Sequence, residues 1–183
     1  MGKIILDISM SLDGIVAKTD NYRLHEWYFK REDNSINEVV DELIQDTGAI
    51  IMGRTNYGLG DYFDGFVNNP YQVPHFVLTH SIPDQLPKGD TTFIFVSNGI
   101  ESALAQAKAA ACDKHVIIAG GVNTAQQYIK AGLLDEIHIH LVPVVLGDGL
   151  HLFEHNSGVY PDLECMMVKP SPGVTHLQYR IVK

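Results

Sequence analysis

The sequence is poor in cysteine. Its 183 residues include only two, Cys112 and Cys165. Neither belongs to a CxxC motif or to a cysteine–histidine spacing of the kind that binds zinc. A disulfide framework and a structural zinc site are therefore not expected. The two residues are interpreted as buried free thiols of a protein that works in a reducing compartment.

Positive charge and long apolar runs are also scarce. Lys and Arg number 13 against 22 Asp and Glu, so the formal net charge is −9. This balance argues against non-specific binding to nucleic acid, although a few local donors can still hold a phosphate. No apolar run approaches the roughly 20 residues of a membrane-spanning helix, and the amino-terminal segment lacks a secretion signal pattern. We therefore expect a cytoplasmic protein that binds neither nucleic acid nor membrane.

Several catalytic signatures are missing. The chain has no GxxxxGK[ST] phosphate loop, no GxSxG nucleophile elbow and no complete GxGxxG fingerprint. His138 and His140 share one face of an expected strand, but no third ligand accompanies them, so no metal site is predicted. Glu32 and Asp33 follow Trp27 in a polar segment and are more typical of solvated loop charges than of an acid–base pair.

What the sequence does contain is an alternation of short apolar strands with helices. Strand patterns fall at residues 4–10, 49–52, 75–79, 91–96, 115–119, 136–145, 163–169 and 174–181. Helical spacing falls at residues 35–45, 99–111 and 123–131. This alternation predicts an α/β protein with a mainly parallel central sheet, and the strand-rich tail indicates a C-terminal antiparallel hairpin. No linker divides the chain, so one domain over residues 1–183 is expected.

Two of the expected strands run into glycine just before a helix, at residues 53–55 and 120–124. A helix start presents unpaired backbone N–H groups, and glycine lets an anion approach the backbone closely. Asn123 or Thr124 is a candidate cap for the second helix. Two such sites in one domain favour a bound dinucleotide, while a turn or tight strand–helix packing is the alternative reading of each glycine site alone.

Three other places are candidates for ligand contact. Thr79, His80 and Ser81 end a strand and suit the 2′-phosphate that separates NADPH from NADH, although a polar strand end has equal weight. Asp13 and Gly14 predict a tight turn after the first strand. The only tryptophan lies in a polar segment, where it forms either a wall of a ligand site or a satellite of the core.

Across these segments the chain resembles the dihydrofolate reductase superfamily, and most of all the reductase domain of bacterial riboflavin biosynthesis, the RibD C-terminal-like branch. The matching motifs occur in order: SLDG at 11–14, IMGRT at 51–55, VLT at 77–79, IAGG at 118–121, LDEIH at 134–138 and PVVLGDG at 143–149. The resemblance implies a dihydrofolate-reductase-like three-layer α/β/α fold and NADPH as cofactor. Because members of the family often pair, it also implies a homodimer.

The resemblance further implies roles for individual residues. Those implied for NADPH binding are Val16, Ala17, Gly53, Arg54, Thr55, Thr79, His80, Ser81, Gly120, Gly121, Val122, Asn123 and Thr124. Those implied for the substrate cleft are Ser9, Trp27 and Asp33. Dihydrofolate reductases carry a single acid on the first helix, facing the pterin. No residue of the corresponding stretch 33–37 aligns with that acid, so no catalytic residue is assigned.

The expected function is an NADPH-dependent reductase that transfers hydride to a small heterocycle of the ribosylamino-pyrimidine or pterin type. This activity is similar to that of 5-amino-6-(5-phosphoribosylamino)uracil reductase and dihydrofolate reductase. Hydride transfer needs orientation and exclusion of water rather than a nucleophile. The alternative is a non-catalytic NADP(H)-binding or sensor protein on the same fold, since a fold does not fix a function.

Overall fold

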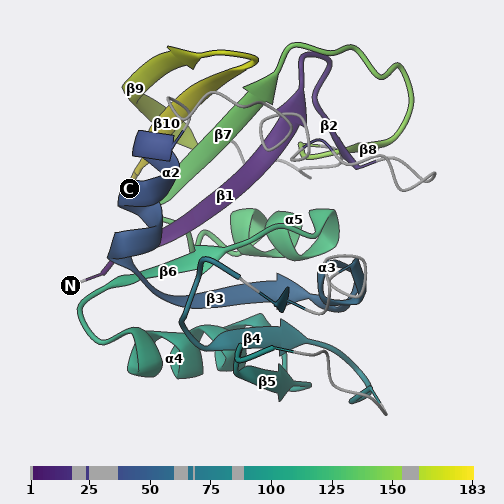
Figure 1. Ribbon diagram of the computed structural model, residues 1–183, viewed down its shortest axis with the longest axis vertical. Helices are drawn as coiled ribbons and strands as arrows, with labels where there is room; N and C mark the ends of the chain where they lie inside the picture. Colours follow the sequence, from purple (N-terminus) through teal and green to yellow (C-terminus); the bar gives the residue numbers. More distant parts are fainter. Residues whose placement is uncertain are drawn as a thin grey trace.

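One large sheet organises the molecule. The computed structural model describes residues 2–17, 24, 37–59, 66–67, 69–83, 89–153 and 161–183. An eight-stranded sheet has the order β5–β4–β3–β6–β1–β7–β10–β9 (Figure 1). Its strands are β1 (Ile4–Ser11), β3 (Thr47–Gly53), β4 (His75–Leu78), β5 (Phe93–Val96), β6 (His115–Ile118), β7 (Glu136–Val142), β9 (Asp162–Ser171) and β10 (Val174–Val182). A small second sheet pairs β2 (Ile15–Ala17) with β8 (Leu150–His151).

The sheet is parallel from β5 to β7 and antiparallel at its C-terminal end. Each neighbouring pair from β5 through β4, β3, β6, β1 and β7 runs in the same direction. β10 lies antiparallel to β7, and β9 lies antiparallel to β10. These pairings confirm the prediction of a mainly parallel sheet that ends in an antiparallel hairpin.

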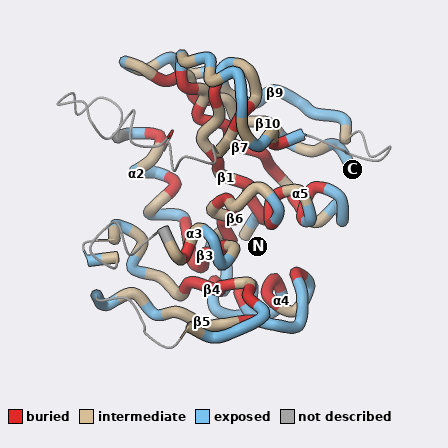
Figure 2. The backbone as a smooth tube through the Cα atoms, turned by 90° about the vertical axis from the view of Figure 1, so that its right-hand side faces the viewer, coloured by how far each residue is buried: buried red, intermediate tan, exposed pale blue. Residues whose placement is uncertain are grey.

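Helices cover both faces of the sheet, which gives three layers. The helices are α2 (Asn37–Asp46), α3 (Arg54–Leu59), α4 (Ile100–Ala111) and α5 (Val122–Lys130). Figure 2 shows α2 on one side of the strands and α4 and α5 on the other. α3 packs on the α2 side, because its Tyr57 joins the same core cluster as Leu43 of α2. The expected three-layer α/β/α architecture is therefore confirmed.

The alternation of side chains along each strand builds a separate core on each face. Leu6 and Ile51 join the cluster beneath α4 and α5, while their neighbours Ile5 and Ile50 join the cluster that includes Leu43 of α2. Alternate strand residues point to opposite faces, so these parallel strands read as continuous apolar runs.

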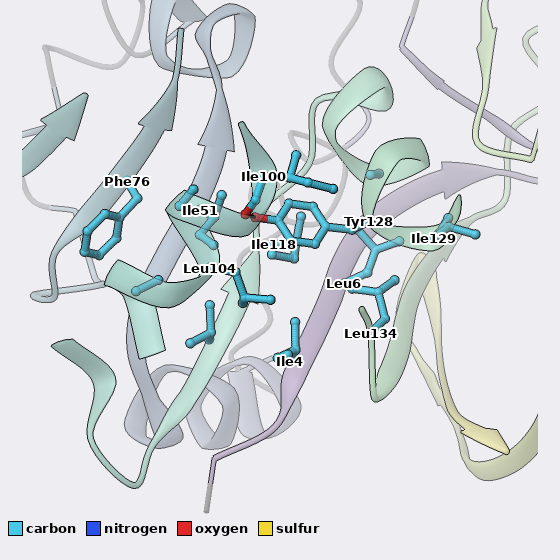
Figure 3. Packing of buried hydrophobic residues seen from close by; sticks show 14 of the residues in the cluster. Ile4, Leu6, Ile51, Phe76, Ile100, Leu104, Ile118, Tyr128, Ile129 and Leu134 are labelled. Carbon is cyan, nitrogen blue, oxygen red and sulfur yellow. Dashed lines mark hydrogen bonds between the residues drawn. The ribbon is translucent and has the colours of Figure 1, made fainter. Parts of the chain in front are cut away.

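The larger core is centred on Tyr128 of α5. Figure 3 shows its ring among apolar side chains from β1, β6 and α4. Tyr128 is fully buried, and its hydroxyl donates a 2.8 Å hydrogen bond to the carbonyl of Ile100. This bond joins α5 to the start of α4.

The connections place one strand, β6, at a switch in the winding. The helix after β6 is α5, which shares the core of α4. The helices that follow β1 and β3 are α2 and α3, which pack on the opposite face through Leu43 and Tyr57. β6 lies between β3 and β1. In open α/β sheets, ligands bind outside the carboxyl ends of strands at such a switch point.

Some local expectations are corrected. Both cysteines are exposed rather than buried: Cys112 follows the last residue of α4, and Cys165 lies on the edge strand β9. The strand expected at 136–145 ends at Val142, because Pro143 follows and the Val144 amide donates back to the Val142 carbonyl. Within the described residues, no helix is both long and apolar enough to span a membrane.

Candidate functional site

The two glycine turns meet at the carboxyl edge of the sheet. The Ala119 amide donates to the Ile51 carbonyl at 2.9 Å, which holds the end of β6 against β3. A Cβ added to Gly121 would lie 3.6 Å from the Gly53 amide nitrogen. A Cβ added to Gly53 would lie only 2.7 Å from Thr124 Oγ1. Glycine at position 53 therefore lets two turns that are far apart in the sequence pack against each other, while an added Cβ on Gly121 would meet Gly53 at an ordinary contact distance.

Asn56 fastens this junction, and sequence reasoning gave it no role. Its Nδ2 atom donates a 2.7 Å hydrogen bond to the Ala119 carbonyl. A Cβ on Gly120 would approach the same nitrogen to 3.0 Å. Gly120 and Gly121 also have φ angles of 74° and 81°, a region that disfavours other residues. The IMGRTN pattern carried no signal for this bond, because it depends on which strands become neighbours.

The residue before α5 is Gly121, which has no side chain to cap the helix. No side chain in the described part of the chain bonds to the first-turn amides. The expectation that Asn123 or Thr124 caps this helix is therefore wrong. Thr124 is buried against Gly53, and Asn123 Oδ1 accepts a 2.6 Å hydrogen bond from Gln127. Amides left without a cap at a helix start are a binding feature for phosphate.

Arg54 and Thr55 begin α3 directly after Gly53, and both are exposed. The Arg54 guanidinium carbon lies 5.0 Å from the centre of the Tyr57 ring, a cation–π arrangement. This contact orients the arginine, which remains an exposed residue. A planar, permanently charged group at this edge is suited to a phosphate.

The third predicted segment lies at the end of the adjacent strand, β4. Thr79 Oγ1 lies 2.7 Å from the Ser81 carbonyl and accepts a 3.2 Å hydrogen bond from the Ser81 amide. Its hydroxyl therefore shapes the turn, while the side chains of His80 and Ser81 are exposed. Because β4 pairs in parallel with β3, this turn lies at the same edge as Gly53.

The small β2–β8 sheet brings the predicted Val16 and Ala17 to the same region. Both are half-buried, and β2 pairs with β8. Gln126 of α5 donates to the His151 carbonyl at 3.0 Å, which ties this sheet to the helix that follows the glycine turn. Two of the candidates for the substrate cleft, Trp27 and Asp33, lie outside the described residues.

The turn between β1 and β2 is fixed by Asp13. Its carboxylate accepts hydrogen bonds from the Ser11 hydroxyl and from the amides of Leu146 and Gly147. The Ser11 bond and then the Gly147 bond lower the pKa of Asp13 to about 2. Gly14 has a φ of 84°, as the predicted tight turn requires. Asp13 therefore holds the SLDG turn at 11–14 against the LGDG turn at 146–149.

A group of histidines and acids lies on the α2 face of β1, β7 and β10. Ser9, the remaining substrate candidate, is half-buried there beside its register partner His140. Asp7 Oδ1 lies 2.8 Å from His140 Nε2, and His140 Nδ1 lies 2.7 Å from His176 Nδ1. The sequence showed that His138 and His140 share a face, but nothing in it indicated the pairing with β1 and β10. Among the residues described, no cluster of His, Cys, Asp or Glu is arranged to hold a metal.

Comparison with known proteins gives a consistent result. The family model of the RibD C-terminal domain matches residues 2–177. The Uncharacterized protein YwjB of Bacillus subtilis (strain 168) is 30% identical over 151 residues, which are 82% of each chain. A putative riboflavin biosynthesis protein from Shewanella sp. PV-4 has a TM-score of 0.81 and 25% identity over 99% of both chains. A dihydrofolate reductase from Enterococcus faecalis, solved with NADP(H) and RAB-propyl, has a TM-score of 0.61 and 16% identity over 100% of this chain and 98% of that chain; this likeness shows the fold alone.

Proposed function

This chain belongs to the RibD C-terminal domain family, and we propose that it is an NADPH-dependent reductase. Its acceptor is a small heterocycle of the ribosylamino-pyrimidine or pterin type. The observation that carries the proposal is the junction of the two glycine turns, beside a strand where the sheet changes its winding. The carboxyl edge of the sheet at such a switch point is where open α/β sheets bind nucleotides.

The residues at the junction suit a nucleotide that carries a pyrophosphate and a 2′-phosphate. The uncapped amides of Val122 and Asn123 provide donors for the pyrophosphate, and the glycines leave room for close approach. The charged fork of Arg54 and the exposed ends of His80 and Ser81 suit the 2′-phosphate. The net charge of −9 does not attract an anionic ligand over a long range. Binding of a phosphate at this site therefore depends on these local donors.

Bound at this edge, NADPH supplies a hydride to an electrophilic carbon of the acceptor. The chain contributes orientation and exclusion of water, which are the main requirements of hydride transfer. Val16 and Ala17 are the candidates for the backbone beside the nicotinamide, because the β2–β8 sheet is tied to α5. Ser9 lies on the adjoining strand β1 and is the described candidate for contact with the acceptor.

Calorimetric titration with NADPH, followed by an assay of NADPH oxidation, tests the proposal. The acceptors are dihydrofolate and 5-amino-6-(5-phosphoribosylamino)uracil. Gly121→Ala is expected to weaken NADPH binding, because the added Cβ would lie 3.6 Å from the Gly53 amide nitrogen, inside the junction that the nucleotide must enter. Gly132→Ala is the matched control: Gly132 ends the same helix region at a φ of 64° with nothing within 4 Å of an added Cβ. Equal effects of the two substitutions, or no uptake of NADPH by the unchanged protein, would refute the cofactor site.

A second function, a non-catalytic NADP(H) sensor, is favoured by one observation. The stretch 33–37 offers no clear counterpart to the acid that dihydrofolate reductases carry on their first helix. The same experiment separates the two functions. Tight NADPH binding without oxidation in the presence of either acceptor supports the sensor, whereas turnover with one of them supports the reductase.

A further inference from the structure

Two histidines of β7, His138 and His140, each pair with a carboxylate, and the two pairs differ in what surrounds them. His138 Nε2 lies 3.0 Å from Glu136 Oε2, and Glu136 also pairs with Lys3. His140 Nε2 lies 2.8 Å from Asp7 Oδ1, and its other nitrogen contacts His176. The first pair is therefore closed by a lysine, while the second forms a chain from a carboxylate through two imidazoles.

The carboxylate end of this chain lies level with the end of the β1–β6 pairing. The pairing of β1 with β6 ends at Leu6 and Ile118, so Asp7 is the first residue of β1 beyond it. At that level β6 passes into the glycine turn at 120–121. The Asp7 side chain keeps 19% of its surface exposed, against 5% for His140. Its second oxygen, Oδ2, has no hydrogen-bond partner among the described residues.

The charges around His140 favour an ion pair with Asp7. Burial disfavours a charged imidazole, but the Asp7 carboxylate outweighs it and raises the pKa of His140. Burial likewise opposes ionisation of Asp7, but the charge and hydrogen bond of His140 lower the pKa of that carboxyl. A proton is therefore held between the two groups near neutral pH.

The other ionisable neighbours among the described residues leave that proton on His140. Burial, and then the charge on His140, lower the pKa of His176 to about 4. Burial also lowers the pKa of His138, despite the nearby acids Asp7 and Glu136. The cation on β9, Lys169, faces His176 and is neutralised by Glu38 of α2. His176 is therefore neutral, and its Nδ1 atom accepts the hydrogen bond from His140.

We propose that Asp7 is the catalytic acid of this site, and that His140 and His176 are positioning residues that store and orient its proton. This inference rests on the proposed reductase function. As hydride reaches the electrophilic carbon, the proton on His140 Nε2 passes to the Asp7 carboxyl, and the carboxyl gives a proton to the acceptor heteroatom. Asp7 is left ionised, and His140 is left neutral with its remaining hydrogen on Nδ1, bonded to His176. The acceptor gains one hydride and one proton, and solvent restores the proton on His140.

The stored proton is visible without any substrate. In protein labelled with ¹⁵N at histidine, NMR titration is expected to show both His140 nitrogens protonated at pH 6.5, with a midpoint above that of an ordinary histidine. Asp7→Asn is expected to lower this midpoint, because it removes the negative charge while keeping the shape of the side chain. A His140 that is neutral at pH 6.5, or a midpoint that Asp7→Asn leaves unchanged, would overturn the proposal.

The kinetic test compares the two histidines of β7. His140→Gln keeps a donor to Asp7 but cannot store a proton, and it is expected to lower kcat about 100-fold. It also removes the alkaline limb of the pH profile, while the dissociation constant of NADPH stays the same. His138→Gln makes the same exchange in the neighbouring pair and is expected to keep the wild-type kcat and profile. Asp7→Asn is expected to match His140→Gln in kcat, which guards against a purely structural loss in either variant.

The outcomes separate this proposal from the function on which it rests. Two results would refute the role of Asp7 as the catalytic acid without contradicting the reductase function. One is turnover by His140→Gln with an unchanged alkaline limb, and the other is an equal loss of kcat in His140→Gln and His138→Gln. If the unchanged protein binds NADPH but oxidises it with neither acceptor, the reductase function is refuted, and so is the role of Asp7 as the catalytic acid.

Discussion

The contact between the two glycine turns predicts a strong coupling between Gly53 and Thr124. A Cβ at Gly53 would lie 2.7 Å from Thr124 Oγ1, whereas ordinary contact begins at 3.4 Å. The atoms must therefore separate by about 0.7 Å (3.4 minus 2.7). Thr124 is buried in the first turn of α5, so either its rotamer changes or the helix moves away from β3. Overpacking of this kind costs about 1–3 kcal/mol.

The assay is a double-mutant cycle measured by urea unfolding. In the Thr124→Ala background the offending oxygen is absent, and the threonine Cβ lies at an ordinary 3.9 Å from the added methyl. Gly53→Ala is therefore expected to cost about 1–3 kcal/mol in the wild type and less than about 0.5 kcal/mol in Thr124→Ala. The same cost in both backgrounds would show that the two turns do not touch, and the shared nucleotide site would lose its basis.

Three other substitutions test separate parts of the account. Arg54→Ala is expected to weaken NADPH binding more than NADH binding in parallel calorimetric titrations; equal losses would count against a role at the 2′-phosphate. Asp13 has a pKa held near 2 in the folded state, so its contribution to stability is complete above about pH 4 and disappears as pH falls through 2. Asp13→Asn should therefore flatten the pH dependence of thermal unfolding over that window, and an unchanged curve would show that the bond to Gly147 carries no weight. Tyr128→Phe should lower the free energy of unfolding by about 0.5–1.5 kcal/mol, since it removes the hydrogen bond from the tyrosine hydroxyl to the Ile100 carbonyl; a neutral result would mean that this bond adds nothing to the carbonyl's bond within α4.

The sequence predicted the order and type of most elements, because their signals are local. The helix face formed by Ile100, Leu104, Ala107 and Ala111 is buried as its spacing indicated. The apolar strands became parallel and buried on both faces, as a continuous apolar run implies. The ends of the elements were predicted less accurately. The strand expected at 136–145 extended beyond Pro143, because the apolar run there continues after the strand has ended.

The features that hold the site together were not predictable from local patterns. Asn56 bonds to Ala119, and the two residues are 63 positions apart in sequence. The chain of Asp7, His140 and His176 requires three strands to meet in a specific register. A sequence shows which residues share a strand face, but it does not show which strands are neighbours. The buried state expected of Cys165 was wrong for the same reason, since β9 became an edge strand. Cys112 is exposed at the C-terminal end of α4.

Titration of ¹⁵N-labelled protein with NADPH, followed through the backbone amide signals, tests the central claim most directly. We expect saturable shifts concentrated at Gly53, Gly121 and Val122, with little change in the C-terminal hairpin of β9 and β10. Shifts centred on other parts of the chain, or spectra that NADPH leaves unaltered, would contradict a nucleotide site at the junction of the glycine turns.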